Sequence, residues 1–203
     1  MKQTLALLAI VLGIHAGASA QSFSLGGTLG ANLSKIDGTS FNTAFKSGFL
    51  AGAYAQIRFG KHWGLQPELL FIQSQAKTDS SFDNIYSGIA SDPGSVKNVH
   101  LDYLGIPVLL TYRILKIIDL QAGPQFGILL NKDQHLLNNG EDAFKHGDVT
   151  ILAGAEVHIL RLRVYGRYGW GLGNINNINT STATKSDTWK NQSVQLGLGI
   201  NIL

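Results

Sequence analysis

The chain has 203 residues, no Cys and a formal net charge of +3. The lack of Cys excludes a fold held by disulfide bonds, and so small a charge without a Lys/Arg cluster excludes a basic surface for nucleic acid. Its 24 Gly and 4 Pro suit a curved sheet better than helices, in which each Gly costs about 1 kcal/mol relative to Ala.

The first 20 residues have the order of parts found in a secretory signal peptide. Lys2 precedes an apolar run over residues 5–14, and an Ala-Ser-Ala motif ends at Ala20. The run is too short for a spanning helix, which needs about 20 residues. We therefore expect a cleaved signal peptide over residues 1–20 and one exported domain over residues 21–203. An uncleaved membrane anchor is the alternative.

Eight later segments alternate apolar and polar residues with period two, which is the pattern of a β-strand with one apolar and one polar face. In chain order they cover residues 24–36, 47–60, 63–75, 100–114, 118–131, 148–160, 162–175 and 193–203. In the last segment, Val194, Leu196 and Leu198 share one face, whereas Gln195 and Gly197 share the other. A strand needs roughly 9–11 residues to cross a bilayer, and each segment is long enough.

The connections between these segments alternate strictly between short and long. Residues 60–62, 115–117 and 160–161 make tight turns, and residues 37–46, 76–99, 132–147 and 176–192 make long polar connections. This alternation is typical of a transmembrane barrel with short periplasmic turns and longer outer loops. We therefore predict an all-β fold, an eight-stranded antiparallel transmembrane β-barrel with up-and-down meander topology. Both termini would lie on the short-turn side, and the last strand would close against the first.

The composition of the polar faces favours a membrane barrel over a soluble barrel or sandwich. These faces are rich in Gly, and charged residues make up only 14% of the chain. The water-facing exterior of a soluble barrel would carry many more Lys, Glu and Thr. Aromatic residues at or near strand ends would form girdles at the membrane interfaces. These residues are Phe59, Trp63, Phe71, Tyr112, Tyr168 and Trp170. A soluble periplasmic barrel around an apolar ligand is the alternative.

Short motifs follow one another along these segments: Gly30-x-Asn32-x-Ser34, Leu65-Gln66-Pro67-Glu68-Leu69-Leu70-Phe71, Tyr103-Leu104-x-Ile106-Pro107 and Arg167-Tyr168-x-x-Gly171-Leu172. Their order and spacing resemble the PorT-like family of small outer-membrane β-barrel proteins of Bacteroidetes-type bacteria. The resemblance implies a location in the outer membrane of a Gram-negative cell. It also implies, from some relatives, a part in protein secretion, and it brings no catalytic residues.

Five charged residues on the polar faces would lie inside the barrel: Arg58, Glu68, Glu156, Arg163 and Arg167. Eight strands enclose a lumen that side chains can fill, so a carboxylate buried there needs a cationic partner. We expect Glu68 to pair with Arg58, and Glu156 to pair with Arg163 or Arg167. These pairs would form an ion-pair plug, and a proton or ion path is the alternative.

No motif in the chain predicts catalysis or a cofactor. The candidate side chains are His100, His135, His146 and His158, together with scattered Ser and Asp residues. None belongs to a nucleophile motif or a zinc-protease motif. The two His-x-Asp pairs, at His100 and His146, could each offer metal ligands, but their strands are not neighbours in a meander. We therefore predict no enzyme activity, no metal site and no cofactor.

The long connections carry aromatic residues, namely Phe41, Phe45, Phe82, Tyr86 and Trp189. These would either cap the barrel or form a contact surface for a protein or glycan. The sequence predicts a non-enzymatic protein in contact with outer-membrane lipid, with a structural or interaction role through its outer loops, within a secretion or envelope assembly. The alternative is a lipid-active or small-ligand-binding barrel, which a cavity lined by Ser, His and Asp near one rim would favour.

Overall fold

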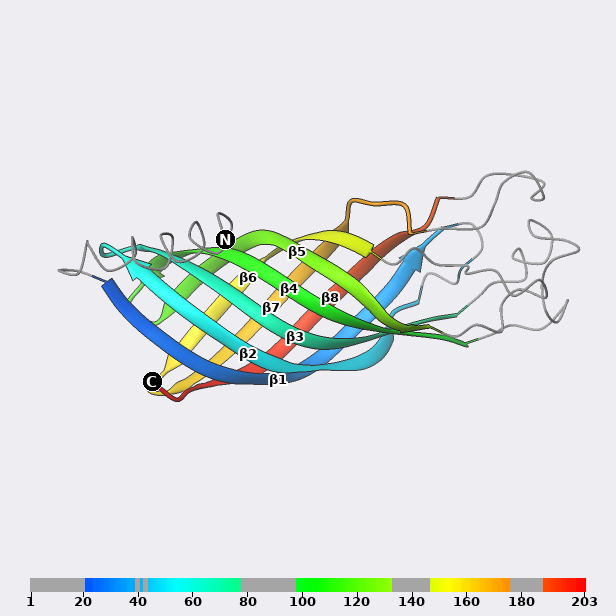
Figure 1. Cartoon of the computed structure of the whole chain (residues 1–203). Helices are drawn as coiled ribbons and strands as arrows, with labels where there is room; N and C mark the ends of the chain where they lie inside the picture. Colours follow the sequence, from blue (N-terminus) through cyan, green and yellow to red (C-terminus); the bar gives the residue numbers. More distant parts are fainter. Residues whose placement is uncertain (1–20, 39–40, 42–43, 78–97, 133–146, 176–187) are drawn as a thin grey trace, which may run out of the picture.

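Eight β-strands form a closed antiparallel barrel in the computed structural model of the chain (Figure 1). The structure describes residues 21–38, 41, 44–77, 98–132, 147–175 and 188–203. The strands are β1 (Gln21–Asp37), β2 (Lys46–Phe59), β3 (Trp63–Lys77), β4 (Asn98–Leu115), β5 (Ile118–Lys132), β6 (Gly147–Ile159), β7 (Leu162–Gly171) and β8 (Lys190–Asn201). Each strand pairs with its neighbours in the chain, which confirms the predicted meander.

The first 20 residues, where the sequence predicts a signal peptide, lie outside the described residues. Within the part of the chain that the structure describes, no helix has both the length and the apolar character needed to cross a bilayer.

The barrel closes between β8 and β1, as the sequence predicts. β8 pairs with β7 on one side and with β1 on the other, and Leu198 of β8 lies opposite Leu29 of β1. Beyond the last register pair, the Ile202 N–H donates to the Leu25 carbonyl oxygen at 2.8 Å. Closure therefore removes the sheet edges whose unpaired backbone groups hydrocarbon cannot satisfy.

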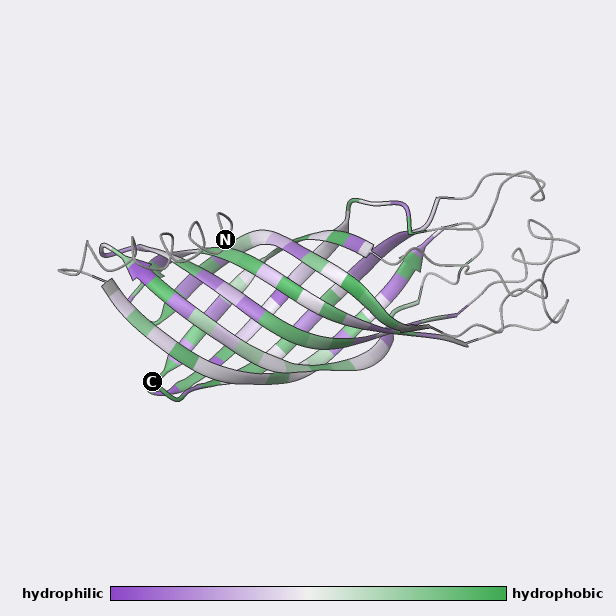
Figure 2. Ribbon diagram, viewed as in Figure 1, coloured by the Kyte–Doolittle hydropathy of each residue, from purple (hydrophilic) through white to green (hydrophobic). Residues whose placement is uncertain are grey.

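Side chains alternate between the outer wall and the lumen along the strands, and hydrophobic and hydrophilic bands alternate accordingly (Figure 2). Leu29, Leu69 and Leu198 face outward and are 64%, 53% and 61% exposed. Gln66 and Gln195 lie on the opposite faces and are buried. The predicted assignment of strand faces is therefore confirmed, and a wall of exposed aliphatic side chains suits hydrocarbon rather than water.

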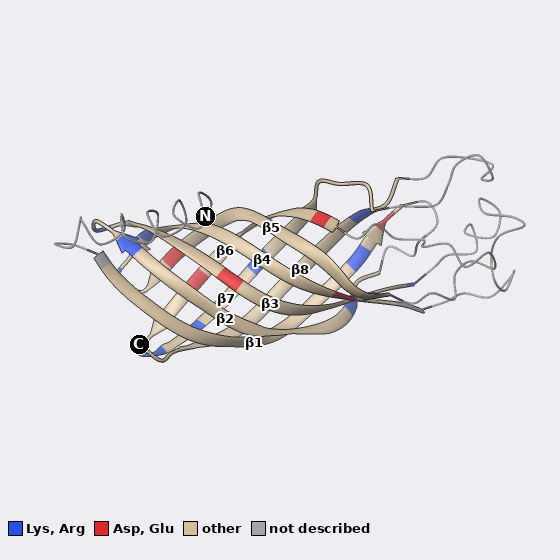
Figure 3. Cartoon of the chain, viewed as in Figure 1, with Lys and Arg blue, Asp and Glu red and all other residues tan. Residues whose placement is uncertain are grey.

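The lumen changes character along its length, which the sequence analysis did not predict. Apolar inward side chains fill much of the half that leads to the long connections, among them Leu50, Leu70, Ile72, Leu101 and Leu129. Charged positions gather in the half nearer the short turns and at the outer ends of the strands (Figure 3). The outer half of the lumen therefore combines apolar side chains with buried polar ones such as Ser74 and Gln195.

β7 ends at Gly171 rather than at residue 175, because the chain then turns onto the segment before β8. The Trp189 N–H donates to Oδ1 of Asn174 at 2.9 Å, and the Ile175 N–H donates to the Trp189 carbonyl oxygen at 2.9 Å. Phe41 packs edge-on against Trp189 with ring centroids 4.9 Å apart, and both rings are buried. These two loop aromatics form a packed cap at the outer rim.

Of the three remaining loop aromatics, one is exposed and two lie outside the described residues. Phe45 is 40% exposed, with Nζ of Lys35 5.2 Å from its ring centroid. Phe82 and Tyr86 lie outside the described residues. Phe45 is thus the described loop aromatic that presents an accessible face at the outer rim.

We expect Leu29→Arg to reduce the fraction of chain that folds into a membrane. Leu29 is the central residue of β1 and faces outward, and an Arg at the bilayer midplane of a barrel wall costs about 2–4 kcal/mol. The folded fraction can be measured by heat-modifiable gel mobility after refolding into lipid vesicles. Leu29→Phe is the matched control and should fold like the wild type. Equal folding of the Arg variant would contradict a lipid-facing β1.

Candidate functional site

The five charged residues singled out in the sequence all lie on the inner face of the barrel. Arg58 comes from β2, Glu68 from β3, Glu156 from β6, and Arg163 and Arg167 from β7. Glu68, Glu156, Arg163 and Arg167 are at most 5% exposed, and the side chain of Arg58 is 14% exposed. They occupy the central and short-turn parts of the lumen, where the structure brings them into one connected network.

The centre of this network is an ion pair that crosses the lumen from β7 to β3. Nη1 and Nη2 of Arg167 donate to Oε2 and Oε1 of Glu68 at 2.9 and 2.7 Å, a bidentate geometry. Nε of Arg167 donates to Gln121 at 2.8 Å, and Gln66 donates to Oε1 of Glu68 at 2.8 Å. The pair is therefore held from both sides by amide side chains.

The expected pair between Glu68 and Arg58 does not form. In the β2–β3 hairpin, Glu68 lies opposite Tyr54, whereas Arg58 lies opposite Gly64, so the register separates the two charges along the barrel. Arg58 instead donates from Nη2 to Oδ2 of Asp119 on β5 at 2.5 Å. Arg58 and Glu68 thus each pair with a residue across the lumen, on β5 and β7 respectively, rather than with each other.

Asp119 connects side chains from three other strands in the short-turn half of the lumen, and the sequence analysis did not single it out. Its fully buried carboxylate also accepts from Nε of Arg113 at 2.8 Å and lies 2.9 Å from Nε2 of His158. Arg113 and Asp119 are register partners on either side of the short β4–β5 turn. Opposite charges at such flanking positions are a signal from which this pair could have been predicted.

Glu156 lies near both arginines that the sequence offered as its partners. Its carboxylate oxygens are 3.4 Å from Nη1 of Arg163 and 4.0 Å from Nη2 of Arg167. Gln121 donates to Oε2 of Glu156 at 3.0 Å, so one amide side chain joins Glu156 to the central pair. Arg163 in turn donates to the side-chain oxygens of Gln56 and Gln66.

Two tyrosine rings support the arginines from the side. The guanidinium carbon of Arg163 lies 4.5 Å from the ring centroid of Tyr54, and that of Arg167 lies 4.0 Å from the ring centroid of Tyr165. Stacking of this kind stabilises a buried cation. A Cβ added at Gly197 would lie 2.3 Å from the Tyr165 ring, so this Gly is needed for the close approach of ring and wall.

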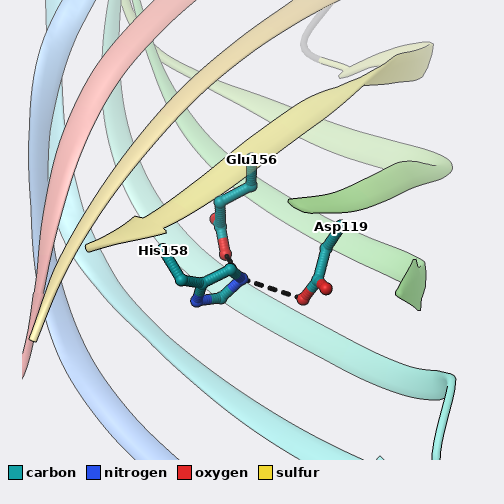
Figure 4. Close-up of side chains that lie close together, drawn as sticks. All are labelled: Asp119, Glu156 and His158. Carbon is teal, nitrogen blue, oxygen red and sulfur yellow. Dashed lines mark hydrogen bonds and ion pairs between the residues drawn. The ribbon is translucent and has the colours of Figure 1, made fainter. Parts of the chain in front are cut away.

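Asp119, Glu156 and His158 form the one group of possible metal ligands found among the described residues (Figure 4). Their ligand atoms all lie within 4.8 Å of one another, and the His158 ring sits between the two carboxylates. However, both oxygens of Asp119 already accept from Arg58 or Arg113. A metal ion there would lie against two guanidinium groups, so the arrangement fits an internal salt bridge better than a metal centre.

The two His-x-Asp pairs do not form one site. Asp148 faces the lumen from the start of β6, whereas His100 is exposed at the start of β4. β5 separates the two strands, as the sequence predicts. His146 and His135 lie outside the described residues.

The six aromatic residues assigned to girdles fall into two groups along the barrel. Phe59, Trp63 and Tyr112 lie side by side in register at the short-turn end, and Trp63 and Tyr112 contact each other with ring centroids 4.7 Å apart. Tyr168 and Trp170 pair toward the outer end of β7, with centroids 4.5 Å apart. Phe71 of β3 lies 5.5 Å from Phe49 of β2, also in the outer half. Phe59, Trp63 and Tyr112 therefore lie at the short-turn end of the wall, and the other three lie farther toward the long connections.

Comparison with known proteins agrees with this architecture. A family model described as an outer membrane protein beta-barrel domain matches residues 19–177. Ail, the attachment invasion locus protein of Yersinia pestis, solved with the heparin analogue sucrose octasulfate, has 12% identity and a TM-score of 0.52, covering 89% of this chain and 99% of that chain. Neisserial surface protein A has 10% identity and a TM-score of 0.50, covering 91% and 100%. No curated protein matches the chain significantly in sequence. At these identities the structural likeness shows the fold alone.

We expect Glu68→Ala to lower the stability of the folded barrel by about 3–5 kcal/mol, because it leaves Arg167 buried without its carboxylate. The free energy of unfolding can be measured by urea titration in lipid vesicles. Asp37→Ala, which removes an exposed carboxylate at the rim, is the control and should change stability little.

A double-mutant cycle separates the pair from its surroundings. Glu68→Ala and Arg167→Ala together should lower the free energy of unfolding by clearly less than the sum of the two single changes, since each single change leaves the other charge buried without a partner. Additive effects, or an unchanged stability for Glu68→Ala, would contradict a structural ion pair.

Proposed function

The chain belongs to the outer membrane protein beta-barrel domain family, and on that basis we propose that it is a sealed, non-enzymatic barrel that works through its outer loops. It lies in the outer membrane of a Gram-negative cell, with lipid around its wall. The loops would contact a protein partner, in a secretion or envelope assembly of the kind that the PorT-like resemblance implies. The aromatic groups at the two ends of the wall would anchor the barrel at the membrane interfaces.

The cross-lumen network is the observation that carries this proposal. Arg167 and Glu68 join β7 to β3, and Arg58 and Asp119 join β2 to β5, so charged side chains bridge the lumen in two directions. A barrel of eight strands has an interior that side chains can fill. With the charges paired to one another, the lumen serves as an ion-pair plug and the surfaces left for function are the wall and the loops.

The arrangement of polar groups also favours a non-enzymatic role. The polar cavity in the outer half of the lumen is lined by Ser74, Ser193 and Asp148, but by none of the described His residues. His158 lies elsewhere, between two carboxylates. A nucleophile and its base must lie within hydrogen-bond reach, so these groups do not support a lipid-active barrel.

The sealed lumen can be tested by conductance. We expect the purified, refolded chain to give no stepwise conductance in planar lipid bilayers across the voltage range in which a porin does. A porin inserted into the same bilayer is the positive control, and heat-modifiable mobility shows that the tested sample is folded. Reproducible current steps from the folded chain would contradict the plug and favour the ion path.

The interaction role can be tested by photo-crosslinking in intact cells. A photoreactive residue at Phe45, which is 40% exposed at the outer rim, should capture a partner protein. The same residue at Phe23, which is 59% exposed near the short-turn end of the wall, is the matched control and should contact lipid. Capture of surface glycan at Phe45, as the ligand of Ail would suggest, would replace the protein partner in the proposal. Lipid adducts alone at both positions would contradict an interaction role.

A further inference from the structure

A small cavity lies in the outer half of the lumen, between the ion-pair plug and the outer rim. It leaves about 10 Å³ for the centre of a water-sized particle, which is room for roughly one water molecule or one bare ion. Its lining includes Asn32 of β1, Tyr103 of β4, Asp148 of β6 and Gln195 of β8. Residues from four separate strands thus converge on a space of single-ion size.

Each of these four residues contributes a buried oxygen without a hydrogen-bond partner. The atoms are Oδ1 of Asn32, the hydroxyl of Tyr103, Oδ1 of Asp148 and Oε1 of Gln195. The residues are only 1%, 4%, 6% and 1% exposed, respectively. A buried polar atom without a partner costs about 1–3 kcal/mol, so four of them around one cavity point to something that they bind in common.

The donors of the two amides are already used, which leaves their oxygens for the cavity. Nδ2 of Asn32 donates to the Gln73 carbonyl oxygen at 2.9 Å and to Oγ of Ser74 at 3.1 Å. Nε2 of Gln195 donates to Oε1 of Gln125 at 3.1 Å. Turning either amide over would break these bonds, so the two amides present oxygen acceptors rather than donors to the cavity.

Asp148 gives the site its charge. Oδ2 of Asp148 accepts from the neutral groups Nδ2 of Asn191 at 3.1 Å and Oγ1 of Thr150 at 3.3 Å. Among the described residues, no Lys, Arg or His forms an ion pair with Asp148, whereas Glu68, Asp119 and Glu156 all lie beside arginines. An uncompensated carboxylate in such a place is costly, and a bound cation removes that cost.

We propose that this cavity binds a single sodium-sized monovalent cation through the oxygens of Asn32, Tyr103, Asp148 and Gln195. Carboxylate, amide and hydroxyl oxygens are the ligands that hard cations prefer, and the site offers no sulfur or imidazole. One carboxylate balances one positive charge, whereas a divalent ion would leave an excess charge buried. The ion would tie β1, β4, β6 and β8 together in the outer half of the lumen, where the described residues form no internal ion pair.

The experiment compares the thermal stability of the full chain, refolded in detergent micelles, in sodium chloride and in choline chloride of equal concentration. The midpoint is the temperature at which half of the sample loses its compact gel mobility. We expect sodium to raise the wild-type midpoint over choline, by on the order of 5 °C at saturation. We expect Asp148→Asn to remove this difference.

Asp102→Asn is the matched control, because Asp102 also has a buried oxygen without a partner but does not line the cavity. It should keep the full sodium effect. If Asp148→Asn fails to fold, Tyr103→Phe removes one ligand oxygen and should raise the sodium concentration needed for half the effect several-fold.

Equal wild-type midpoints in sodium and choline would overturn the proposal, since a water molecule or a proton on Asp148 would then suffice. A rise with calcium chloride but not with sodium chloride would overturn the monovalent assignment. Retention of the sodium effect in Asp148→Asn would overturn the site.

Discussion

Hydrocarbon offers no hydrogen-bond partner to a backbone N–H or C=O, and the rest of this structure depends on how the chain meets that constraint. The ladder between β8 and β1 completes the circle of backbone bonds. Once the circle is closed, every second side chain must face inward, because side chains alternate along a strand. The outer wall can be simple and aliphatic, but the inward-facing side chains of all eight strands must fit into a narrow lumen.

The lumen solves this packing problem in two ways. In the outer half it uses many aliphatic side chains such as Leu50 and Leu70, which need no partners, around a small polar cavity. In the short-turn half it uses long charged and amide side chains, which fill space only if their polar ends are matched. Tyr165 illustrates how closely the two requirements are linked, because its ring lies against Gly197 and supports the guanidinium of Arg167. The Gly-rich inner face is thus the counterpart of the large side chains.

The sequence predicts the strands, their faces and their order, because alternation and loop length are local properties that a chain displays directly. It also predicts that Glu156 lies near Arg163, since β6 and β7 form a hairpin with both residues near its short turn. It does not predict that Glu68 pairs with Arg167, because that contact depends on the stagger of strands around the barrel and on which walls face each other. The expected pair Arg58–Glu68 does not form for a local reason: with Phe59 opposite Trp63 across the short turn, Tyr54, not Arg58, lies opposite Glu68.

The ion pairs therefore discriminate between strand registers that the aliphatic wall would accept equally. A slip of one residue between two strands would exchange the inner and outer faces, and a slip of two would keep the faces while changing the height of every residue. Aliphatic side chains on the wall resist the first error but hardly the second, since Leu29 would meet Leu196 about as well as it meets Leu198. The bidentate contact between Arg167 and Glu68, and the sharing of Asp119 by Arg58 and Arg113, tolerate no such change in height. A buried ion pair adds little net stability over a well-packed apolar pair, so we infer that its contribution here is to select one stagger of the strands.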